Sequence, residues 1–320
     1  MSFLEDTIQA YMTYLPPLTR QPDFDAFWDE TLARTRALPL EPELTAVDYP
    51  SPYVSVYDIS YNGFDRTRIR GWLLLPRFIS RQQFPCLIQY HGFSGSRGEP
   101  WELLPWVMQG LAVLAVDCRD QGGDSGNSAC YSNGLVANVT TRGILDPHEY
   151  YYRAVYMDCV KALDFAVSCG QLDPDRLILH GRSQGGALTM AVSALDDRPC
   201  LALADVPSNS NLEKRVEGQH GSFAAVTEYL RRYPERLTQV YTTLSYFDTM
   251  NLAGWINCPV YASVALGDQI CPAKLYFATY NRIDSPKEIT VYPFNGHDGA
   301  DSRQMTRKLS YLQQSGLLAY

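Results

Sequence analysis

The sequence has 320 residues, of which 46% are hydrophobic and 19% charged, and its formal net charge is −8. This composition is typical of a folded globular protein and argues against a long disordered chain. The negative charge argues against nucleic acid as a partner, because phosphate binding depends on clustered Lys and Arg. The densest basic feature of the sequence is the isolated pair Arg231-Arg232.

The N-terminal residues lack the basic and then apolar pattern of a secretory signal. No apolar stretch approaches the roughly 18 to 20 residues that span a bilayer. We therefore expect a cytoplasmic protein without a membrane partner. The eight cysteines are scattered without a C-x-x-C pair, and the five histidines form no H-E-x-x-H motif. Reduced, buried thiols are the expected state of the cysteines, and the sequence predicts neither a metal nor a cofactor.

The first predicted element is a helix within residues 22–38, which belongs to an N-terminal helical extension covering residues 1–50. Asp23 is a candidate N-cap of this helix. Four apolar side chains share one helical face and predict packing on a core, namely Phe24, Phe27, Trp28 and Leu32.

Residues 53–75 are rich in β-branched and aromatic side chains around the dipeptide Asn62-Gly63. This pattern predicts an antiparallel hairpin that turns at Asn62-Gly63.

Short, nearly continuous apolar runs follow and are typical of strands buried on both faces: CLIQY, LAVLAVD, RLILH, LALADV, VYASVAL and EITVYPF. Stretches of helical period separate them, such as ELLPWVMQG and YYYRAVYMDCVKALDFAVSC. Alternating strands and helices predict a doubly wound, mostly parallel sheet in one α/β domain over residues 1–320. About residues 207–259 form a predicted insertion before the penultimate strand, either a lid or an oligomer contact.

The segment Gly181-Arg182-Ser183-Gln184-Gly185 lies between a predicted buried strand and a predicted helix. In the α/β-hydrolase fold, a G-x-S-x-G turn in this position lifts a serine hydroxyl above the sheet. The small flanking residues Gly181 and Gly185 relieve crowding in the turn. We therefore predict that Ser183 is a nucleophile.

A serine nucleophile in this fold requires an acid and then a histidine, in that chain order. Only His220 and His297 follow Ser183. His220 lies in a polar stretch of the insertion, whereas His297 lies in the Gly-flanked turn NGHDG after the last predicted strand. The sequence therefore favours His297 as the base.

Two aspartates between Ser183 and His297 end predicted strands, where such a sheet gathers catalytic groups. Asp268 is the preferred acid, and Asp205 is its competitor. The oxyanion of an acyl-transfer reaction also requires two N–H donors. We expect them from Gln184, directly after the nucleophile, and from Phe93 in the loop HGFSG.

The chain resembles the acetyl xylan esterases and cephalosporin C deacetylases of carbohydrate esterase family seven. The matching segments are DFDAFW, YHGFSGSRG, VDCRDQGGDSG, GILDPHEYYYR, GRSQGG, GDQICP, FATYNRI and NGHDG. The resemblance implies the triad Ser183, Asp268 and His297, with Phe93 and Gln184 as oxyanion donors. It also implies supporting roles for Arg119 and Gln121. The family removes acetyl groups from sugars, short xylo-oligosaccharides and cephalosporin C, so a small acetylated substrate and a cytoplasmic homohexamer are expected.

Three residues depart from the family pattern. The family's Arg-Gly-Gln motif has Asp120 at its centre here, which we expect to add a carboxylate near the site. Phe93 replaces the usual Tyr of the oxyanion loop, and Asp298 replaces the usual Glu after the histidine. These substitutions bear on substrate preference rather than on the catalytic groups.

Overall fold

The computed structural model describes residues 3–318 and is built around a nine-stranded sheet of order β1-β2-β3-β5-β4-β6-β7-β8-β9. The strands are β1 (Glu43–Val47), β2 (Val54–Asn62), β3 (Arg68–Pro76), β4 (Phe84–Tyr90), β5 (Ala112–Val116), β6 (Leu172–Arg182), β7 (Pro199–Asp205), β8 (Val260–Ala265) and β9 (Lys287–Tyr292). Strands β4 to β9 pair in parallel, whereas β1, β2 and β3 are antiparallel to their neighbours. The doubly wound, mostly parallel sheet is thus confirmed.

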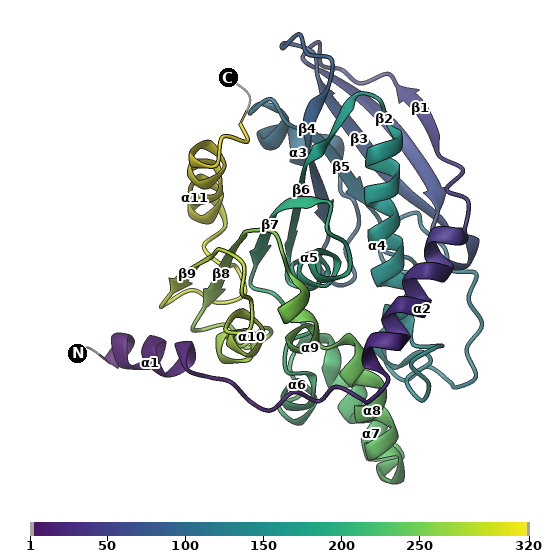
Figure 1. Cartoon of the computed structure of the whole chain (residues 1–320), viewed down its shortest axis with the longest axis vertical. Helices are drawn as coiled ribbons and strands as arrows, with labels where there is room; N and C mark the ends of the chain where they lie inside the picture. Colours follow the sequence, from purple (N-terminus) through teal and green to yellow (C-terminus); the bar gives the residue numbers. More distant parts are fainter. Residues whose placement is uncertain (1–2, 319–320) are drawn as a thin grey trace.

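Helices cover both faces of the sheet (Figure 1). They are α1 (Phe3–Met12), α2 (Phe24–Ala37), α3 (Pro100–Val107), α4 (Tyr151–Ser168), α5 (Gln184–Leu195), α6 (Leu212–Glu217), α7 (Ala224–Arg232), α8 (Leu237–Phe247), α9 (Thr249–Leu252), α10 (Ala273–Tyr280) and α11 (Asp301–Gln314). Side chains of α2, α4, α5 and α10 share one apolar core, and those of α3 and α11 share the core on the opposite face. The strands between them are apolar on both sides for this reason.

The predicted helix after Asp23 is α2, and its apolar face is buried except at Leu32, which is half-buried. Asp23 makes no side-chain cap hydrogen bond; its carboxylate instead accepts a hydrogen bond from the hydroxyl of Tyr246 in α8. The extension is not purely helical, because β1 forms an exposed edge strand against β2.

The hairpin turn differs from the prediction. Asn62 is still paired with Arg68, so the connection between β2 and β3 is the five residues 63–67. One N–H of this turn is fixed from outside the hairpin, since the Asp158 carboxylate in α4 accepts a hydrogen bond of 2.7 Å from the N–H of Phe64. A Cβ on Gly63 would lie 2.2 Å from that carboxylate, so glycine is required here for close approach rather than for a two-residue turn.

The segment between β7 and β8 contains helices α6 to α9 and packs against the rest of the chain. Phe223, which precedes α7, is buried and stacks on Tyr152 of α4 with ring centroids 6.2 Å apart. Asn251 of α9 accepts a hydrogen bond of 3.1 Å from the N–H of Thr19 near the N-terminus. The insertion is therefore part of the folded body.

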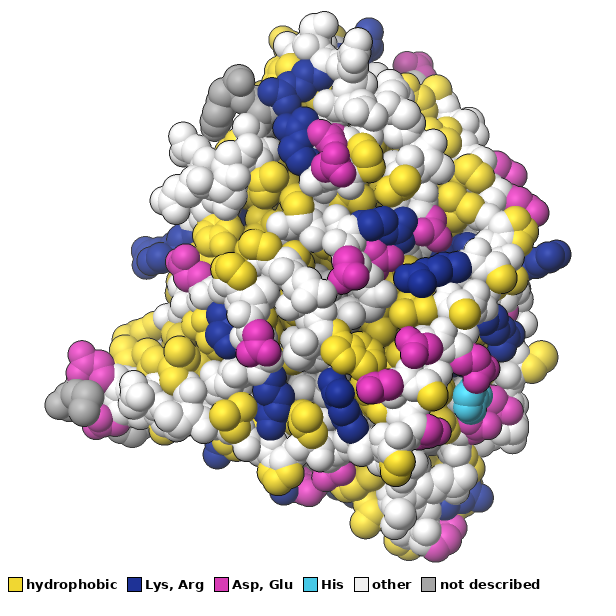
Figure 2. Space-filling model, in the orientation of Figure 1, with side chains coloured by type: hydrophobic (Ala, Val, Ile, Leu, Met, Phe, Trp, Pro, Cys, Tyr) yellow, Lys and Arg dark blue, Asp and Glu magenta, His cyan; other side chains and the backbone are white. Residues whose placement is uncertain are grey.

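Among the described residues, no helix combines the length and the apolarity that crossing a membrane requires. On the face drawn in Figure 2, acidic and basic side chains are scattered among hydrophobic and uncharged ones.

Candidate active site

Ser183 lies in a strained turn between β6 and α5. Its φ of 58° and ψ of −118° place a non-glycine residue in a sparsely populated backbone region. The turn is fixed by a hydrogen bond of 2.9 Å from the N–H of Ser183 to the carbonyl of Asp205 in β7. Helix α5 begins at the next residue, so the positive end of its dipole lies next to the hydroxyl.

The glycines on either side of Ser183 allow this turn to close. A Cβ on Gly181 would lie 2.2 Å from the backbone of Gly185, and a Cβ on Gly185 would lie 2.0 Å from the carbonyl oxygen of Tyr90. Both contacts are far inside van der Waals distance, so any larger residue would force the strand and the helix apart. The local sequence thus dictates an elbow geometry.

The structure brings Ser183, His297 and Asp268 together in one chain of hydrogen bonds. His297 Nε2 lies 3.1 Å from Ser183 Oγ, and His297 Nδ1 lies 2.8 Å from Asp268 Oδ2. The other carboxylate oxygen accepts hydrogen bonds of 2.8 Å from the N–H groups of Ile270 and Cys271. Asp268 is thereby fixed by its own loop, and the imidazole is fixed by Asp268.

The two alternative residues lie elsewhere. His220 contacts the carbonyl of Gln269 through Nδ1 at 3.0 Å. Asp205 is buried in an ion pair with Lys308 of α11 and accepts a hydrogen bond of 2.8 Å from Ser263. Neither residue contacts His297 or the hydroxyl of Ser183 in the described hydrogen bonds, so the geometry separates Asp205 from Asp268.

Hydrogen bonds and burial oppose each other at the two ionisable groups. Burial disfavours the Asp268 carboxylate, but its hydrogen bonds with His297 and the loop N–H groups outweigh this and lower its pKa. The hydrogen bond to Asp268, followed by one to Cys271, raises the pKa of His297 to about 9 against the effect of burial. The pair therefore stabilises a positively charged imidazole, which is the form a general base takes after accepting a proton.

Gln121 links the two segments that are predicted to supply the oxyanion donors. Its Oε1 accepts a hydrogen bond of 2.8 Å from the N–H of Ser94, next to Phe93. Its side-chain amide also exchanges hydrogen bonds of 3.0 and 3.1 Å with the amide of Gln184. The loop after β4 and the start of α5 are thus held at a fixed distance from each other.

Arg119 is completely buried and does not line the pocket over Ser183. Its guanidinium pairs with Asp158 of α4 at 2.6 Å and with Asp65 of the hairpin turn at 3.0 Å. Its carbonyl accepts a hydrogen bond from the hydroxyl of Tyr151. Arg119 therefore fixes the backbone that leads to Gln121.

The two acidic departures from the family pattern have local partners. Asp120 has a φ of 56°, which explains why glycine suits this position, and its carboxylate pairs with Arg142. Asp298 accepts a hydrogen bond of 2.8 Å from the N–H of Gly296 and so stabilises the turn that carries His297. Asp120 thus adds a carboxylate to this loop, as expected, and Arg142 neutralises its charge.

A pocket of about 510 Å³ opens over Ser183. The residues that line it are Gly92, Phe93, Arg182, Ser183, Gly221, Ser222, Ile270 and His297. Gly221 and Ser222 belong to the insertion between β7 and β8, so that segment forms part of the wall. Arg182 donates hydrogen bonds to the carbonyl of His297 and, at 2.8 Å, to Asp301, which ties the elbow to the turn of the base.

Sequence reasoning missed two residues at this site. Cys271 Sγ lies 3.7 Å from Ser183 Oγ, and Nη2 of Arg215 lies 3.7 Å from the same sulfur. Asp268, Cys271 and His297 place potential metal ligands within 4.8 Å of one another. Asp268 and His297 already bind each other, and the guanidinium of Arg215 opposes a cation beside the thiol, so we assign no metal here.

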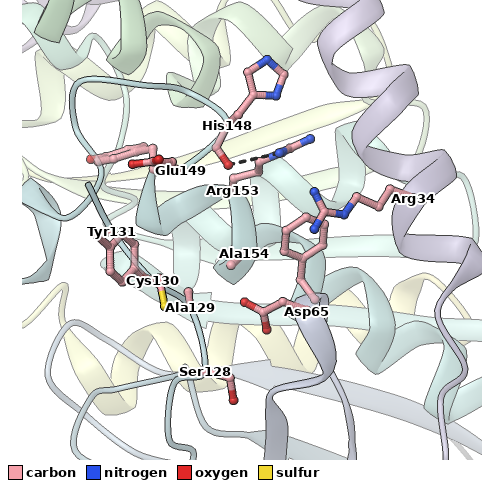
Figure 3. Close-up of a pocket in the computed structure, with 12 residues that line it drawn as sticks. Arg34, Asp65, Ser128, Ala129, Cys130, Tyr131, His148, Glu149, Arg153 and Ala154 are labelled. Carbon is pink, nitrogen blue, oxygen red and sulfur yellow. Dashed lines mark hydrogen bonds between the residues drawn. The ribbon is translucent and has the colours of Figure 1, made fainter. Parts of the chain in front are cut away.

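A second pocket, of about 260 Å³, shares no lining residue with the pocket over Ser183. Figure 3 shows Arg34 on the side of α2 and the segment with Cys130 and Tyr131 on the opposite side. The dashed line marks a hydrogen bond of 3.1 Å from Arg153 to the carbonyl of His148. None of the site residues predicted from the sequence lines this pocket.

The sheet order and the elbow define the class of the protein, the α/β hydrolases. The α/β hydrolase GrgF from Penicillium sp. shares the fold, with a TM-score of 0.57 and 19% identity over 81% of this chain and 98% of that one. The family model of acetyl xylan esterase (AXE1) matches residues 1–315, and the chain belongs to this family.

Two solved members of the family are similar over almost their whole length. An acetyl xylan esterase from Paenibacillus sp. R4 has a TM-score of 0.91 and 41% identity, over 95% of this chain and 99% of that one. Acetyl xylan esterase 1 from Thermoanaerobacterium sp. has a TM-score of 0.90 and 28% identity, over 96% and 98%. Among curated proteins, the acetyl esterase Axe7A of Xylanibacter ruminicola is 28% identical over 92% of this chain and 68% of its own length.

Proposed function

We propose that this protein is a serine esterase that removes acetyl groups from O-acetylated sugars and xylo-oligosaccharides. The observation that supports this most directly is the chain of hydrogen bonds that joins Ser183, His297 and Asp268 at a pocket. The protein that contains this arrangement is a member of the acetyl xylan esterase family. The names of the similar proteins support the same activity.

In the proposed mechanism, His297 Nε2 accepts the proton of Ser183 as the hydroxyl attacks the acetyl carbonyl. Asp268 holds Nδ1 protonated and stabilises the resulting imidazolium. The negative charge on the carbonyl oxygen is met by the N–H groups of Phe93 and Gln184 and by the N-terminus of α5. His297 then returns the proton to the departing sugar hydroxyl, and water releases acetate from Ser183 by the same steps in reverse.

The surroundings of Ser183 support a short acyl group. Cys271 Sγ lies only 3.7 Å from Ser183 Oγ, and Ile270, Phe93 and His297 line the space beside it. A confined site rejects added methylenes by steric overlap, whereas an open apolar groove gains about 0.8 kcal/mol for each one buried. The two arrangements predict opposite trends with acyl length.

The proposal is tested with acetate, butyrate and octanoate esters of one alcohol, run beside acetylated xylobiose and cephalosporin C. We expect kcat/KM to fall as the acyl chain lengthens, and we expect the two acetylated natural compounds to be hydrolysed. A rise in kcat/KM with chain length would instead indicate a general carboxylesterase. Cephalosporin C deacetylation, a single catalytic domain over residues 1–320, the hexamer and the cytoplasmic location stay predictions from sequence and resemblance.

A further inference from the structure

The guanidinium of Arg215 is buried beside the active site without a carboxylate partner among the described residues. The residue is 2% exposed, and its Nε has no hydrogen-bond partner there. Nη2 donates a hydrogen bond of 2.9 Å to the carbonyl of Ile270 and lies 3.7 Å from Cys271 Sγ. The ring of Phe223 is centred 5.7 Å from the central carbon of the guanidinium. Because a buried cation without a counter-charge is costly, this arrangement favours negative charge on the adjacent thiol.

Cys271 faces both reacting groups of the proposed mechanism. Its sulfur lies 3.7 Å from Ser183 Oγ, and its potential ligand atom is within 4.8 Å of those of His297 and Asp268. Its backbone N–H is held by Asp268 at 2.8 Å, which fixes the thiol relative to the imidazole. Any atom added to this sulfur therefore lies close to both the nucleophile and the base.

Cys271 shares a lowered pKa with Cys118, whose hydrogen bond with Cys159 has the largest effect there, whereas Cys200 and Cys258 behave differently. Burial raises the pKa of Cys200 and of Cys258 to about 11. Burial also disfavours the Cys271 thiolate, but Arg215 and the hydrogen bond with His297 outweigh it and lower the pKa of Cys271. The thiolate is the reactive form of cysteine, so an adjacent cation in a pocket is the environment of a reactive thiol.

We propose that Cys271 is an oxidation site through which small hydroperoxides switch off the esterase. The proposal rests on the proposed function. The thiolate sulfur attacks one peroxide oxygen, so an S–O bond forms while the O–O bond breaks. With hydrogen peroxide, the departing hydroxide takes a proton from solvent and leaves as water, while the second OH group stays on the sulfur. The sulfur is thereby oxidised to a sulfenic acid and the peroxide is reduced. The new oxygen forms hydrogen bonds with His297 and Arg215. His297 then no longer accepts the proton of Ser183.

The switch is reversible by a small dithiol. One thiol attacks the sulfenic sulfur and releases water, which leaves a mixed disulfide, and the second thiol then frees Cys271 and closes the reagent's own disulfide. Cys271 is only 3% exposed, and its neighbours Ile270, Ser183 and His297 line the pocket over Ser183. We expect a molecule as small as hydrogen peroxide to reach the thiol from this pocket, whereas the bulky disulfide of glutathione is excluded.

The test treats the full-length wild type, Cys271→Ala and Cys130→Ser with hydrogen peroxide, and then assays acetyl ester hydrolysis. Cys130 is exposed and is the matched control for a thiol outside the site. We expect wild type and Cys130→Ser to lose about tenfold or more of their activity and to recover it with dithiothreitol. Cys271→Ala should keep the activity it had before treatment. Dimedone should trap the sulfenic acid on the Cys271 peptide.

Two results would overturn the proposal: equal inactivation of Cys271→Ala, or a dimedone adduct on another thiol, such as Cys118, in place of Cys271. Arg215→Met should slow formation of the Cys271 adduct, and Arg215→Lys should restore it. If Cys271→Ala proves inactive before treatment, the rates at which dimedone labels Cys271 in the wild type and in the Arg215 variants still test the proposal. Equal rates in the wild type and Arg215→Met would overturn it. If untreated wild type fails to hydrolyse acetyl esters, the proposed function fails, whereas the adduct still reports on the thiol.

Discussion

The side-chain amides of Gln121 and Gln184 exchange two hydrogen bonds, of 3.0 and 3.1 Å, across the two segments that converge beside Ser183. Gln121 also accepts from the N–H of Ser94, and Gln184 accepts a hydrogen bond of 2.9 Å from the hydroxyl of Tyr152. This network fixes the loop after β4 relative to α5. The separation of the two proposed oxyanion donors therefore depends on a side chain that touches neither substrate nor nucleophile.

Gln121→Leu should lower kcat by about tenfold, less than the roughly 10²- to 10³-fold loss from deleting a donor itself. Leucine fills a similar volume but cannot hold Ser94 or Gln184, so the oxyanion site loosens. Steady-state kinetics on an acetyl ester measure the effect, and KM should change little. Gln109→Leu, the same substitution at a half-buried position just after α3, is the control, because the Gln109 side chain bonds only the carbonyl of Pro105 among the described hydrogen bonds. An equal kcat for both variants would show that Gln121 does not position the oxyanion donors.

Asp268→Asn should lose about 10⁴ in kcat, because an amide holds the wrong tautomer of His297. Asp205→Asn is the matched control: Asp205 is also buried and also ends a strand, but its carboxylate binds Lys308 and Ser263. It should lose stability far more than activity. Thermal unfolding measured beside kcat separates the two effects, and the opposite ranking of the variants would assign the acid to Asp205.

The kcat/KM for an acetyl ester should rise with pH, following the ionisation of a single group with a pKa above neutrality. Protonated His297 cannot accept the Ser183 proton, so kcat/KM grows as the imidazole loses its proton. The hydrogen bond to Asp268 raises the pKa of His297 to about 9, so the midpoint should lie above the ordinary value of about 6.5. Asp268→Asn should move the midpoint down in its residual activity. A wild-type midpoint at or below the ordinary value contradicts the proposed coupling.

Lys308→Met should destabilise the protein by about 3–5 kcal/mol at neutral pH, because it leaves the buried Asp205 carboxylate without its cation. Burial raises the pKa of Asp205, but Lys308 and His180 lower it by more. A depressed carboxyl pKa contributes stability above the unfolded value of about 4, and this contribution is lost on acidification. The difference in the free energy of unfolding between variant and wild type, measured in urea, should therefore become smaller below that pH.

Lys274→Met is the control for this stability measurement, because Lys274 is exposed on α10. It should change the free energy of unfolding by less than about 1 kcal/mol. A similar loss in both variants would show that the effect belongs to the substitution rather than to the buried ion pair.

The elements that position the site were predictable because their signals are local. Apolar runs of five to seven residues mark strands β4 to β9, and the elbow around Ser183 needs glycines at fixed offsets for steric reasons. The turn after Asn62 was not predictable, because its shape depends on a distant residue. The Asp158 carboxylate, which accepts a hydrogen bond from the N–H of Phe64, lies in a helix 94 positions later in the chain. The exposed edge strand β1 also lacks an apolar pattern.

The thiol beside the nucleophile was missed for the same reason. Arg215 and Cys271 are 56 positions apart, and they meet only because the insertion folds back over the carboxyl edge of the sheet. From the sequence alone, a cysteine three residues after Asp268 is interpreted as another small, buried hydrophobic residue. Its distinct character comes from the guanidinium of Arg215, which has no carboxylate partner in the described part of the chain, and no rule of sequence spacing predicts that contact.

If Ser183 is the nucleophile of an acetyl esterase, purified Ser183→Ala should fail to hydrolyse acetylated xylobiose. The variant should keep the wild-type circular dichroism spectrum and lose about 10⁴- to 10⁶-fold in kcat, because only the oxyanion donors and binding remain. Hydrolysis at a rate close to that of the wild type, by a correctly folded variant, would contradict the account.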